Sequence, residues 1–478
     1  MPVKYISICC VLSFLLFSSG CRTVRAAGTP SVPWTPPKTI IEKLSTDSLW
    51  DSLRERKVSP GRIFDIGDLI DIALSNNPQT RQAWEDARVK EAQAIQAASS
   101  WYPSLQGTME LGYDRSVAES NTATVNQSNY GPGASASWLM FDFGGRSAGV
   151  EKARQLLINA NFTFNQTIQD VLLETVRAYY AFDSDRALLE AREADVEDSK
   201  KSLEDAKARL SAGLVSKLDE LQAEASYKQS LYALEDAKRA LESSRADMAV
   251  VLGIPVDTGF DVARSGEEMP KGVSEGDVSS MIEQAIKDRP DILAARAVLE
   301  SKRVEIIRVT SDLLPSVTAS GNAATNWYSH YGSLRGAPTS YNDDYSYGGQ
   351  IKVDWNIFDG FKNFYRRKEA QRDYAAEEQK LINAYLNAGK EVWDSYFTFV
   401  SAKKKYEYSG SYLDSAEMSY ELAAEGYEAG IKNIIDLLSS QSQLSDARSK
   451  FIQSKEDVFV ASARLLYAVG GLTAESEK

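Results

Sequence analysis

Residues 350–361 read QIKVDWNIFDGF and join two segments of different hydrophobic period. The first segment carries an apolar residue at every second position: Ile351, Val353, Trp355 and Ile357. This alternation is typical of a β-strand with one apolar and one polar face. No proline follows Gly360, so the second segment predicts long helices. The chain therefore combines strands with helices longer than those of an ordinary globular domain.

This junction occurs twice, because the chain contains an internal repeat. Trp138 lies 217 positions before Trp355 (355 − 138). Other pairs keep an offset of 217 or 212: Phe141-Asp142 with Phe358-Asp359, Ala212-Gly213 with Ala429-Gly430, Asp219 with Asp436, Gly253 with Gly470, Pro78 with Pro290, and Pro103 with Pro315. The glycine register slips by one after the first pair, since Gly144 aligns with Phe361 and the second glycine is Gly360. Such constant spacing predicts a duplicated fold.

Both repeats, which we place at 64–260 and 275–471, contain a long proline-free stretch that an Ala-Gly pair interrupts. Apolar residues recur at every seventh position of the first stretch: Phe182, Leu189, Val196, Leu203 and Leu210. This spacing, flanked by charged residues, predicts coiled-coil seams. About 65 residues of helix extend roughly 100 Å at 1.5 Å per residue, a length suited to crossing a periplasm.

Strands are predicted at about 103–142 and 315–358, with polar hairpin loops at about 114–132 and 329–345. Aromatic residues cluster at the strand ends, as in the girdles of outer-membrane barrels: Trp101, Tyr102, Trp138, Phe141, Phe143, Trp327, Tyr328, Trp355 and Phe358. Alternating strands also occur on soluble cores. However, no stretch after residue 21 is long and apolar enough for a spanning helix, so a membrane role has to use strands.

Four strands are too few to close a barrel, and open edges in lipid leave backbone groups unpaired. Two copies would give eight strands, whose lumen side chains fill, whereas three give twelve and begin to leave a channel. The predicted fold is therefore mainly α with a small membrane β-barrel portion. Its long coiled-coil helices form a trimeric α-barrel, and a twelve-stranded β-barrel is shared, with four strands from each protomer.

The N-terminal residues predict a signal peptide at 1–20 and a lipid-anchored, proline-rich tether at 21–63. Lys4 precedes an apolar run, and small residues lead into Cys21. This end resembles the lipobox of bacterial lipoproteins, in which the cysteine becomes the acylated first residue. The alternative is an ordinary secretory signal with a chance cysteine. Residues 472–478 are assigned to a C-terminal tail.

Composition limits the function. The formal net charge is −13, and Lys and Arg are dispersed, which argues against a nucleic-acid partner. The sequence contains no nucleophile elbow, phosphate loop or metal-ligand cluster. The single histidine, His330, has no second His or Cys with which to share a metal. We therefore expect no enzymatic activity, no cofactor and no metal.

The duplicated architecture, its Trp…Phe-Asp-Gly junctions and its Ala-Gly…Asp-Leu-Leu turn resemble the TolC family of outer-membrane efflux proteins over about residues 64–471. Members are homotrimers in which a twelve-stranded barrel in the outer membrane continues into an α-helical barrel across the periplasm. Inner-membrane pumps and periplasmic adaptors dock at the far end. The resemblance implies that the Ala-Gly turns at 212–213 and 429–430 are the periplasmic tips.

The resemblance also implies a gate at these tips. Residues 430–438 resemble the family's second-repeat sequence after the glycine, and Asp436 falls on the first of two aspartates that form acidic rings in the closed aperture. The second ring position holds Ser439, a departure that leaves one carboxylate ring. Three such carboxylates at a narrow axis would attract cations and be blocked by them.

A tip latch is implied in the same way. Asp219 matches the aspartate that the family ties to a tyrosine and a basic residue, and those positions fall on Tyr427 and Lys432. Such exposed links contribute roughly 0–1 kcal/mol each, weak enough for a docking partner to open. Helix capping is the alternative explanation for Asp219 and Asp436, and the coiled-coil seam is the alternative for Tyr427.

The expected function is a passive exit duct of a tripartite efflux or secretion system, located in the outer membrane and extending into the periplasm. Its expected partners are two identical copies, a periplasmic adaptor (membrane fusion) protein, an inner-membrane pump and outer-membrane lipid, with no nucleic acid. The alternative is a structural coiled-coil lipoprotein or adhesin that spans the periplasm without transport. Drug, metal and protein cargo all stay open, because the pump largely sets specificity.

Overall fold

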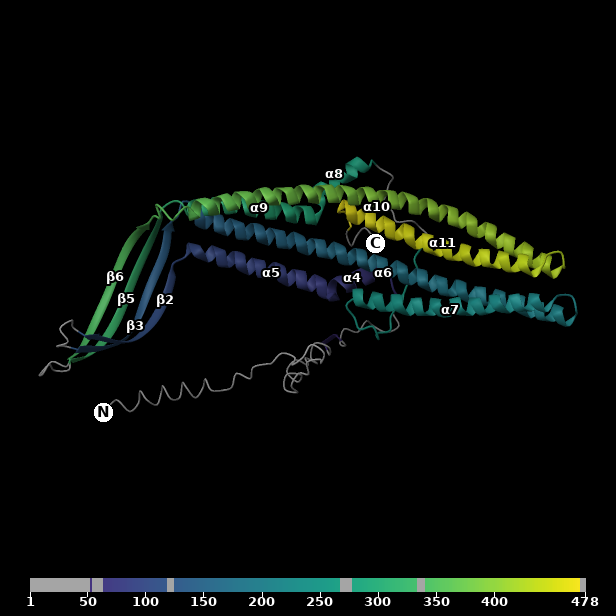
Figure 1. Cartoon of the computed structure of the whole chain (residues 1–478), viewed down its shortest axis with the longest axis horizontal. Coiled ribbons are helices and arrows are strands. Elements are labelled where there is room, and N and C mark those ends of the chain that lie inside the picture. Colours follow the sequence, from purple (N-terminus) through teal and green to yellow (C-terminus); the bar gives the residue numbers. More distant parts are fainter. Residues whose placement is uncertain (1–51, 54–62, 118–123, 267–276, 333–339, 473–478) are drawn as a thin grey trace, which may run out of the picture. The chain divides into compact units, whose positions relative to one another are not determined.

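Two long helical hairpins dominate the computed structural model. The structure describes residues 52–53, 63–117, 124–266, 277–332 and 340–472. Helices α6 (Gly145–Ser211) and α10 (Lys362–Glu428) contain 67 residues each. Each turns back into a shorter helix, α7 (Lys217–Val251) or α11 (Ile434–Val469) (Figure 1). Cys21 and nearly all of the predicted tether lie outside the described residues.

The same order of elements occurs twice, so the predicted duplication is confirmed. Each half begins with two helices, continues through two strands and ends in a long hairpin. The leading helices are α4 (Ile66–Asn76) and α5 (Pro78–Ala98), then α8 (Val278–Asp288) and α9 (Pro290–Ser311). Prolines occupy the first position of α5 and α9, where a missing N–H is tolerated. A short helix, η1 (Ser99–Trp101), follows α5, and strands β1 (Ile63–Phe64) and β4 (Asp261–Val262) pair in parallel.

Four antiparallel strands form one sheet in the order β2-β3-β5-β6. They are β2 (Ser104–Val117), β3 (Thr124–Phe141), β5 (Ser316–Gly332) and β6 (Ser340–Asp354). Among the described residues, β2 and β6 each pair on one side only. The loop predictions at 114–132 and 329–345 were therefore largely wrong. Ladder pairing extends through these polar segments because it satisfies backbone groups whatever the side chains are.

Matched joints connect the sheet to the long helices. The indole of Trp138 donates to the Trp101 carbonyl at 3.1 Å, and that of Trp355 donates to the Leu313 carbonyl at 3.2 Å. Two successive residues with positive φ then start each long helix: Phe143-Gly144 (52° and 90°) and Gly360-Phe361 (69° and 67°). Glycine occupies the first of these positions in one joint and the second in the other. This exchange explains the one-residue slip of the glycine register.

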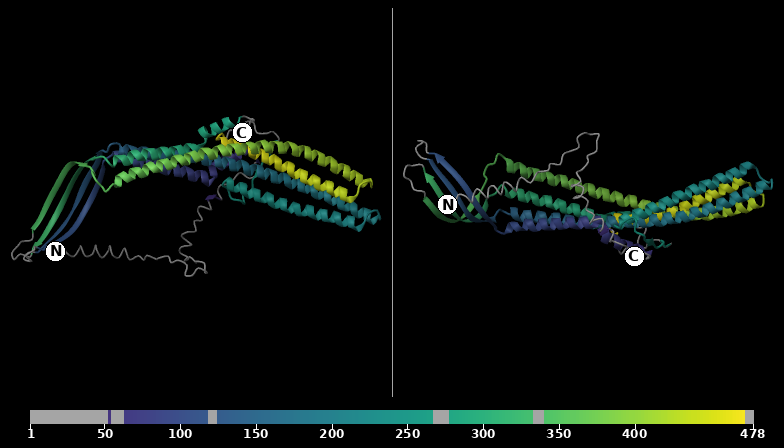
Figure 2. Two further views of the ribbon diagram at one scale, coloured as in Figure 1. Left: turned by 45° about the horizontal axis from the view of Figure 1, so that its top comes forward. Right: turned by 90° about the horizontal axis from the view of Figure 1, so that it is seen from below.

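Within the described residues, α5 and α7 form one edge of the helical layer and α10 forms the other, while α8 packs against α10 and α11. Near the sheet the packing order is α5, α6, α9, α10, and near the hairpin turns it is α7, α6, α11, α10. Figure 1 shows α5 and α7 along the lower side and α10 along the upper side, and both views in Figure 2 show the two long hairpins turning at the same end. The predicted seam is buried or half-buried, with Phe182 and Leu203 in the core. None of the helices in the described residues has the length and apolar character that a membrane span requires.

Candidate functional site at the turns of the long hairpins

Residues 212–216 and 429–433, called the tip turns below, have the same backbone geometry. Gly213 and Gly430 both have φ of 74°. The Leu214 amide donates to the Arg209 carbonyl at 2.9 Å, and the Ile431 amide donates to the Gly426 carbonyl at 2.8 Å. These bonds reach back over the left-handed residue and close the last helical turn, as in a Schellman motif. The predicted break at each Ala-Gly pair is confirmed.

The two predicted aspartates begin the returning helices. Asp219 accepts hydrogen bonds from the Ser216 amide at 2.8 Å and the Ser216 hydroxyl at 3.0 Å. The Asp436 amide donates to Asn433 at 2.8 Å, and the Asp436 carboxylate accepts from the Asn433 amide at 3.5 Å. Both are capping boxes, which place a negative charge at the positive end of a helix. Within one chain, the structure therefore supports the capping interpretation. The gate role of Asp436 stays a prediction.

Tyr427 is 3% exposed, and its hydroxyl oxygen has no hydrogen-bond partner among the described residues. Burial raises the pKa of this hydroxyl, Arg209 opposes the shift, and Asp219 and Asp205 add to it. Asp219 thus lies close enough to act on Tyr427 electrostatically, but no hydrogen bond joins the two side chains. The hydroxyl is enclosed rather than directed toward a latch partner.

The exposed Lys432 does not reach Asp219 either. Its aliphatic stem lies against Gly426, where an added Cβ would approach the Lys432 Cγ to 2.8 Å. Among the described residues, no hydrogen bond or ion pair connects Lys432 with Asp219. The three predicted latch residues are therefore brought to one end of the hairpins but are not tied together within a single chain.

Sequence reasoning missed the basic residues that join α6 to α10 at this end. Arg209 donates to the Glu428 carbonyl at 2.7 Å, and its guanidinium lies 4.5 Å from the centre of the Tyr427 ring. Lys201 forms an ion pair of 3.6 Å with the Glu428 carboxylate. The only signal in the sequence was a basic residue before the glycine break, which is common at any helix C-terminus.

A charged network connects α6 to α11 farther from the tip turns. Asp195, whose side chain is 8% exposed, accepts hydrogen bonds from Arg192 at 3.0 Å, Arg448 at 2.9 Å and Ser445 at 2.5 Å. Arg448 also contacts Asp198 at 3.3 Å. Burial raises the pKa of the Asp198 carboxyl, and Arg448 opposes this shift. The network ties the first hairpin to the second.

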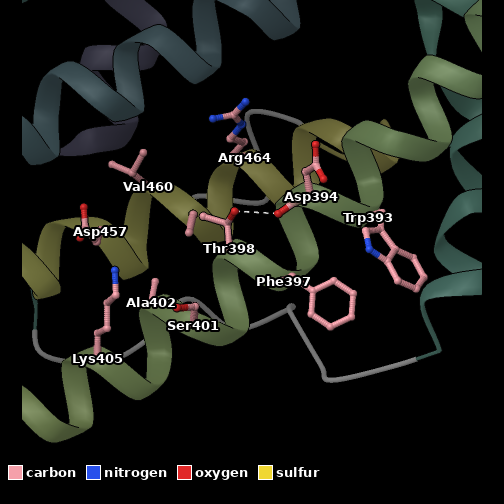
Figure 3. Close-up of a pocket in the computed structure, with 11 residues that line it drawn as sticks. Trp393, Asp394, Phe397, Thr398, Ser401, Ala402, Lys405, Asp457, Val460 and Arg464 are labelled. Atoms are coloured by element: carbon pink, nitrogen blue, oxygen red, sulfur yellow. Dashed lines mark hydrogen bonds between the residues drawn. The ribbon is translucent and has the colours of Figure 1, made fainter.

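A groove of about 800 Å³ lies between α10 and α11 (Figure 3). The exposed rings of Trp393 and Phe397 stand at its margin, with their centroids 4.9 Å apart. Charges of both signs line it: Asp394, Lys405, Asp457 and Arg464. No three His, Cys, Asp or Glu residues within the described part of the chain are placed to hold a metal ion.

Residues 69–254 and 281–471 match the model of a family described as outer membrane efflux protein. This chain belongs to the outer membrane efflux protein family. It is similar to Protein CyaE of Bordetella pertussis, with 29% identity over 413 residues that cover 85% of this chain and 84% of that protein. The pyoverdine export outer membrane protein OpmQ of Pseudomonas aeruginosa is 24% identical over 426 residues, 85% of each chain.

The fold is that of solved outer-membrane channels. The Campylobacter jejuni CmeC outer membrane channel superimposes with a TM-score of 0.72 at 17% identity, covering 95% of this chain and 98% of that one. The resemblance to the TolC family is thus confirmed, as is the predicted mainly α fold with four sheet strands and a duplicated repeat. As an outer membrane efflux protein, the chain is an exit duct for efflux or secretion, and it lies in the outer membrane and extends into the periplasm.

Proposed function

We propose that three copies of this chain form a passive duct that carries solutes from a pump and the periplasm to the exterior, with a gate at the tip turns. The observation that carries this proposal is that, among the described residues, the edge strands β2 and β6 each pair on one side only. The helical layer likewise ends in two outer edges. A chain with two free edges is completed by copies of itself when the edges close into a ring.

The sheet supports closure most directly. Exposed apolar side chains alternate along both edge strands: Leu105, Met109 and Leu111 on β2, Ile351 and Val353 on β6. Such a face suits lipid, where each unpaired backbone group costs several kcal/mol. Pairing β2 with β6 of the next copy removes both edges. Three copies then supply about twelve strands, enough to leave a lumen.

The helical layer presents edges that suit the same assembly. Large exposed apolar residues follow α10: Ile382, Leu386, Trp393, Phe397, Tyr408, Met418 and Leu422. Others lie on α5 and α7 at the opposite edge: Trp84, Val89, Ile95, Leu218, Leu221, Tyr232 and Val250. Packing α10 against α5 and α7 of the next copy would bury both sets, including the aromatic margin of the groove in Figure 3.

Single-channel recording in planar bilayers tests the duct. We expect the purified full-length protein to run as a trimer in detergent and to give discrete conductance steps. A structural periplasm-spanning lipoprotein or adhesin would insert or bind without conducting. A stable trimer that never conducts would reject the duct and favour that alternative.

For the gate, we predict that Asp436→Asn weakens block of the channel by a trivalent cation such as La³⁺ about tenfold. Three carboxylates near one axis hold a cation together, and removing their charge removes most of that attraction. Asparagine keeps a side-chain oxygen for the Asn433 amide, so the start of α11 is preserved. The measurement is the La³⁺ concentration that halves the conductance from the periplasmic side.

Asp414→Asn is the matched control, because it removes an exposed carboxylate from α10 without touching the tip turns. We expect its block to equal that of the unmodified protein. If Asp436→Asn is blocked at the same La³⁺ concentration as the unmodified protein, the gate assignment is rejected. The proposal of a duct is not affected by that result.

We further propose a periplasmic adaptor protein and an inner-membrane pump as partners, and a duct that performs no chemistry of its own. The boundaries at 1–20, 21–63, 64–260, 275–471 and 472–478 belong to the same proposal, as does acylation of Cys21. Mass spectrometry of the mature N-terminus decides the acylation. An unmodified cysteine, or a chain cleaved after residue 21, would exclude it.

A further inference from the structure

The two hairpins of one chain end side by side at the tip turns (Figures 1 and 2). A small buried cluster joins them: Leu203 and Ala206 of α6, Ala223 of α7, Ala423 and Tyr427 of α10, and Ile434 and Leu437 of α11. Three of these seven are alanines, whose side chains bury little apolar area. Polar contacts around it therefore weigh heavily in holding the ends together.

Arg209 makes the most extensive of these contacts. It comes from the last turn of α6 and reaches the end of α10, where its guanidinium covers the Tyr427 ring at 4.5 Å and donates to the Glu428 carbonyl at 2.7 Å. That carbonyl is one of the last four of α10, which lack partners inside their helix. Arg209 thus caps α10 with a charge that favours its negative end.

Tyr427 takes part through its ring rather than its hydroxyl. The hydroxyl is buried and has no hydrogen-bond partner among the described residues, so replacing it with a hydrogen atom removes no hydrogen bond. The ring face is covered by Arg209, and a cation over a partly desolvated tyrosine ring is a stabilising contact. The family resemblance pairs Asp219 with this tyrosine. In the structure, the Asp219 carboxylate instead accepts hydrogen bonds from the Ser216 amide and hydroxyl.

We infer that Arg209 is the clasp between the two hairpins of each chain, and that the ends separate only when Arg209 releases the Tyr427 ring and the Glu428 carbonyl. The Lys201–Glu428 ion pair is a second, more exposed tie to the same residue. This inference rests on the proposed gate at the tip turns. It assigns the closing contact within a protomer to a residue outside the Asp219, Tyr427 and Lys432 set.

The test is single-channel recording of full-length variants from the periplasmic side. We expect Arg209→Ala to raise the ratio of open to closed time roughly fivefold to tenfold, as the loss of a cation–π contact together with a charge-assisted hydrogen bond implies. Lys207→Ala is the matched control: it removes an exposed positive charge from the same turn and should leave the ratio unchanged.

Tyr427→Phe separates the clasp from the latch. It keeps the ring under Arg209, so we expect the closed state to be as populated as in the unmodified channel. A latch made by the Tyr427 hydroxyl to Asp219 would instead open in this variant. Tyr427→Leu removes the ring face, and combining it with Arg209→Ala should add little beyond Arg209→Ala alone, because both changes remove one contact.

Trimer formation in detergent and the maximal conductance of each variant guard against misfolding. Arg209→Lys provides a second variant that keeps the charge but loses the planar fork, so we expect an intermediate ratio. If the unmodified channel conducts and the Arg209→Ala trimer has the same ratio of open to closed time, the clasp is rejected. The proposed duct is not affected by that result. Absence of conductance from every trimer, the unmodified one included, would instead reject the proposed duct.

Discussion

Asparagine in place of Asp195 is expected to lower the free energy of unfolding by about 3 kcal/mol. The substitution leaves Arg192 and Arg448 facing each other without the carboxylate that both donate to. Because the Asp195 side chain is 8% exposed, water replaces little of the lost interaction. Denaturant titration of the purified protein in detergent, followed by circular dichroism, measures the loss.

Asp236→Asn is the control for this prediction. Asp236 also pairs with an arginine, Arg239, at 3.0 Å, but the side chains of this pair are 63% and 71% exposed. Exposed pairs of this kind contribute roughly 0–1 kcal/mol. Equal losses in Asp195→Asn and Asp236→Asn would show that the network between α6 and α11 does not stabilise the fold.

Alanine at Gly253 is expected to cost about 3 kcal/mol or more, part of it strain at positive φ and part a backbone clash. Gly253 ends α7 with φ of 65°, and an added Cβ would lie 2.6 Å from the Asn76 carbonyl oxygen. The Asn77 side chain donates to the Val251 carbonyl at 2.9 Å in the same place, so α7 and the junction of α4 with α5 are tightly joined. Thermal unfolding of the purified variant measures the cost.

Gly213→Ala isolates the conformational part of this cost. Gly213 has a similar φ of 74°, but no atom of the described residues lies within 4 Å of an added Cβ. We expect a loss of about 1 kcal/mol from backbone strain alone. If both alanines destabilise the protein equally, close packing at Gly253 contributes nothing to stability.

Much of the architecture follows from residues with few conformational choices. Pro78 and Pro290 start helices because only a first turn accepts proline, and Gly213 and Gly430 end them because they adopt positive φ. These constraints are local, so their constant spacing revealed the duplication directly. The strand ends were harder to place. Polar composition predicted loops, whereas cross-strand pairing, a nonlocal contact, continued the ladder.

The candidate site likewise contains residues that could be predicted from local sequence and residues that could not. The sequence placed Asp219 and Asp436 at the starts of helices, where the structure has them. Arg209 was not predicted, because its partner Glu428 lies 219 positions away and is reached through a backbone carbonyl that any residue supplies. Contacts of this kind depend on how the hairpins pack, and a single sequence carries no local pattern for them.

The edges of β2 and β6, which are unpaired among the described residues of one chain, also bear on how the proposed trimer matures. Strands β3 and β5 lie between them, so no rearrangement inside one chain can join the two edges. If the proposed trimer closes the sheet, the final folding step depends on encounters between chains, and its rate rises steeply with their concentration. When chains are scarce, each one remains longer with unpaired backbone groups at its strand edges, and this state is the most prone to incorrect pairing. For the proposed trimer, the yield of assembled protein therefore depends on how fast chains are synthesised and delivered.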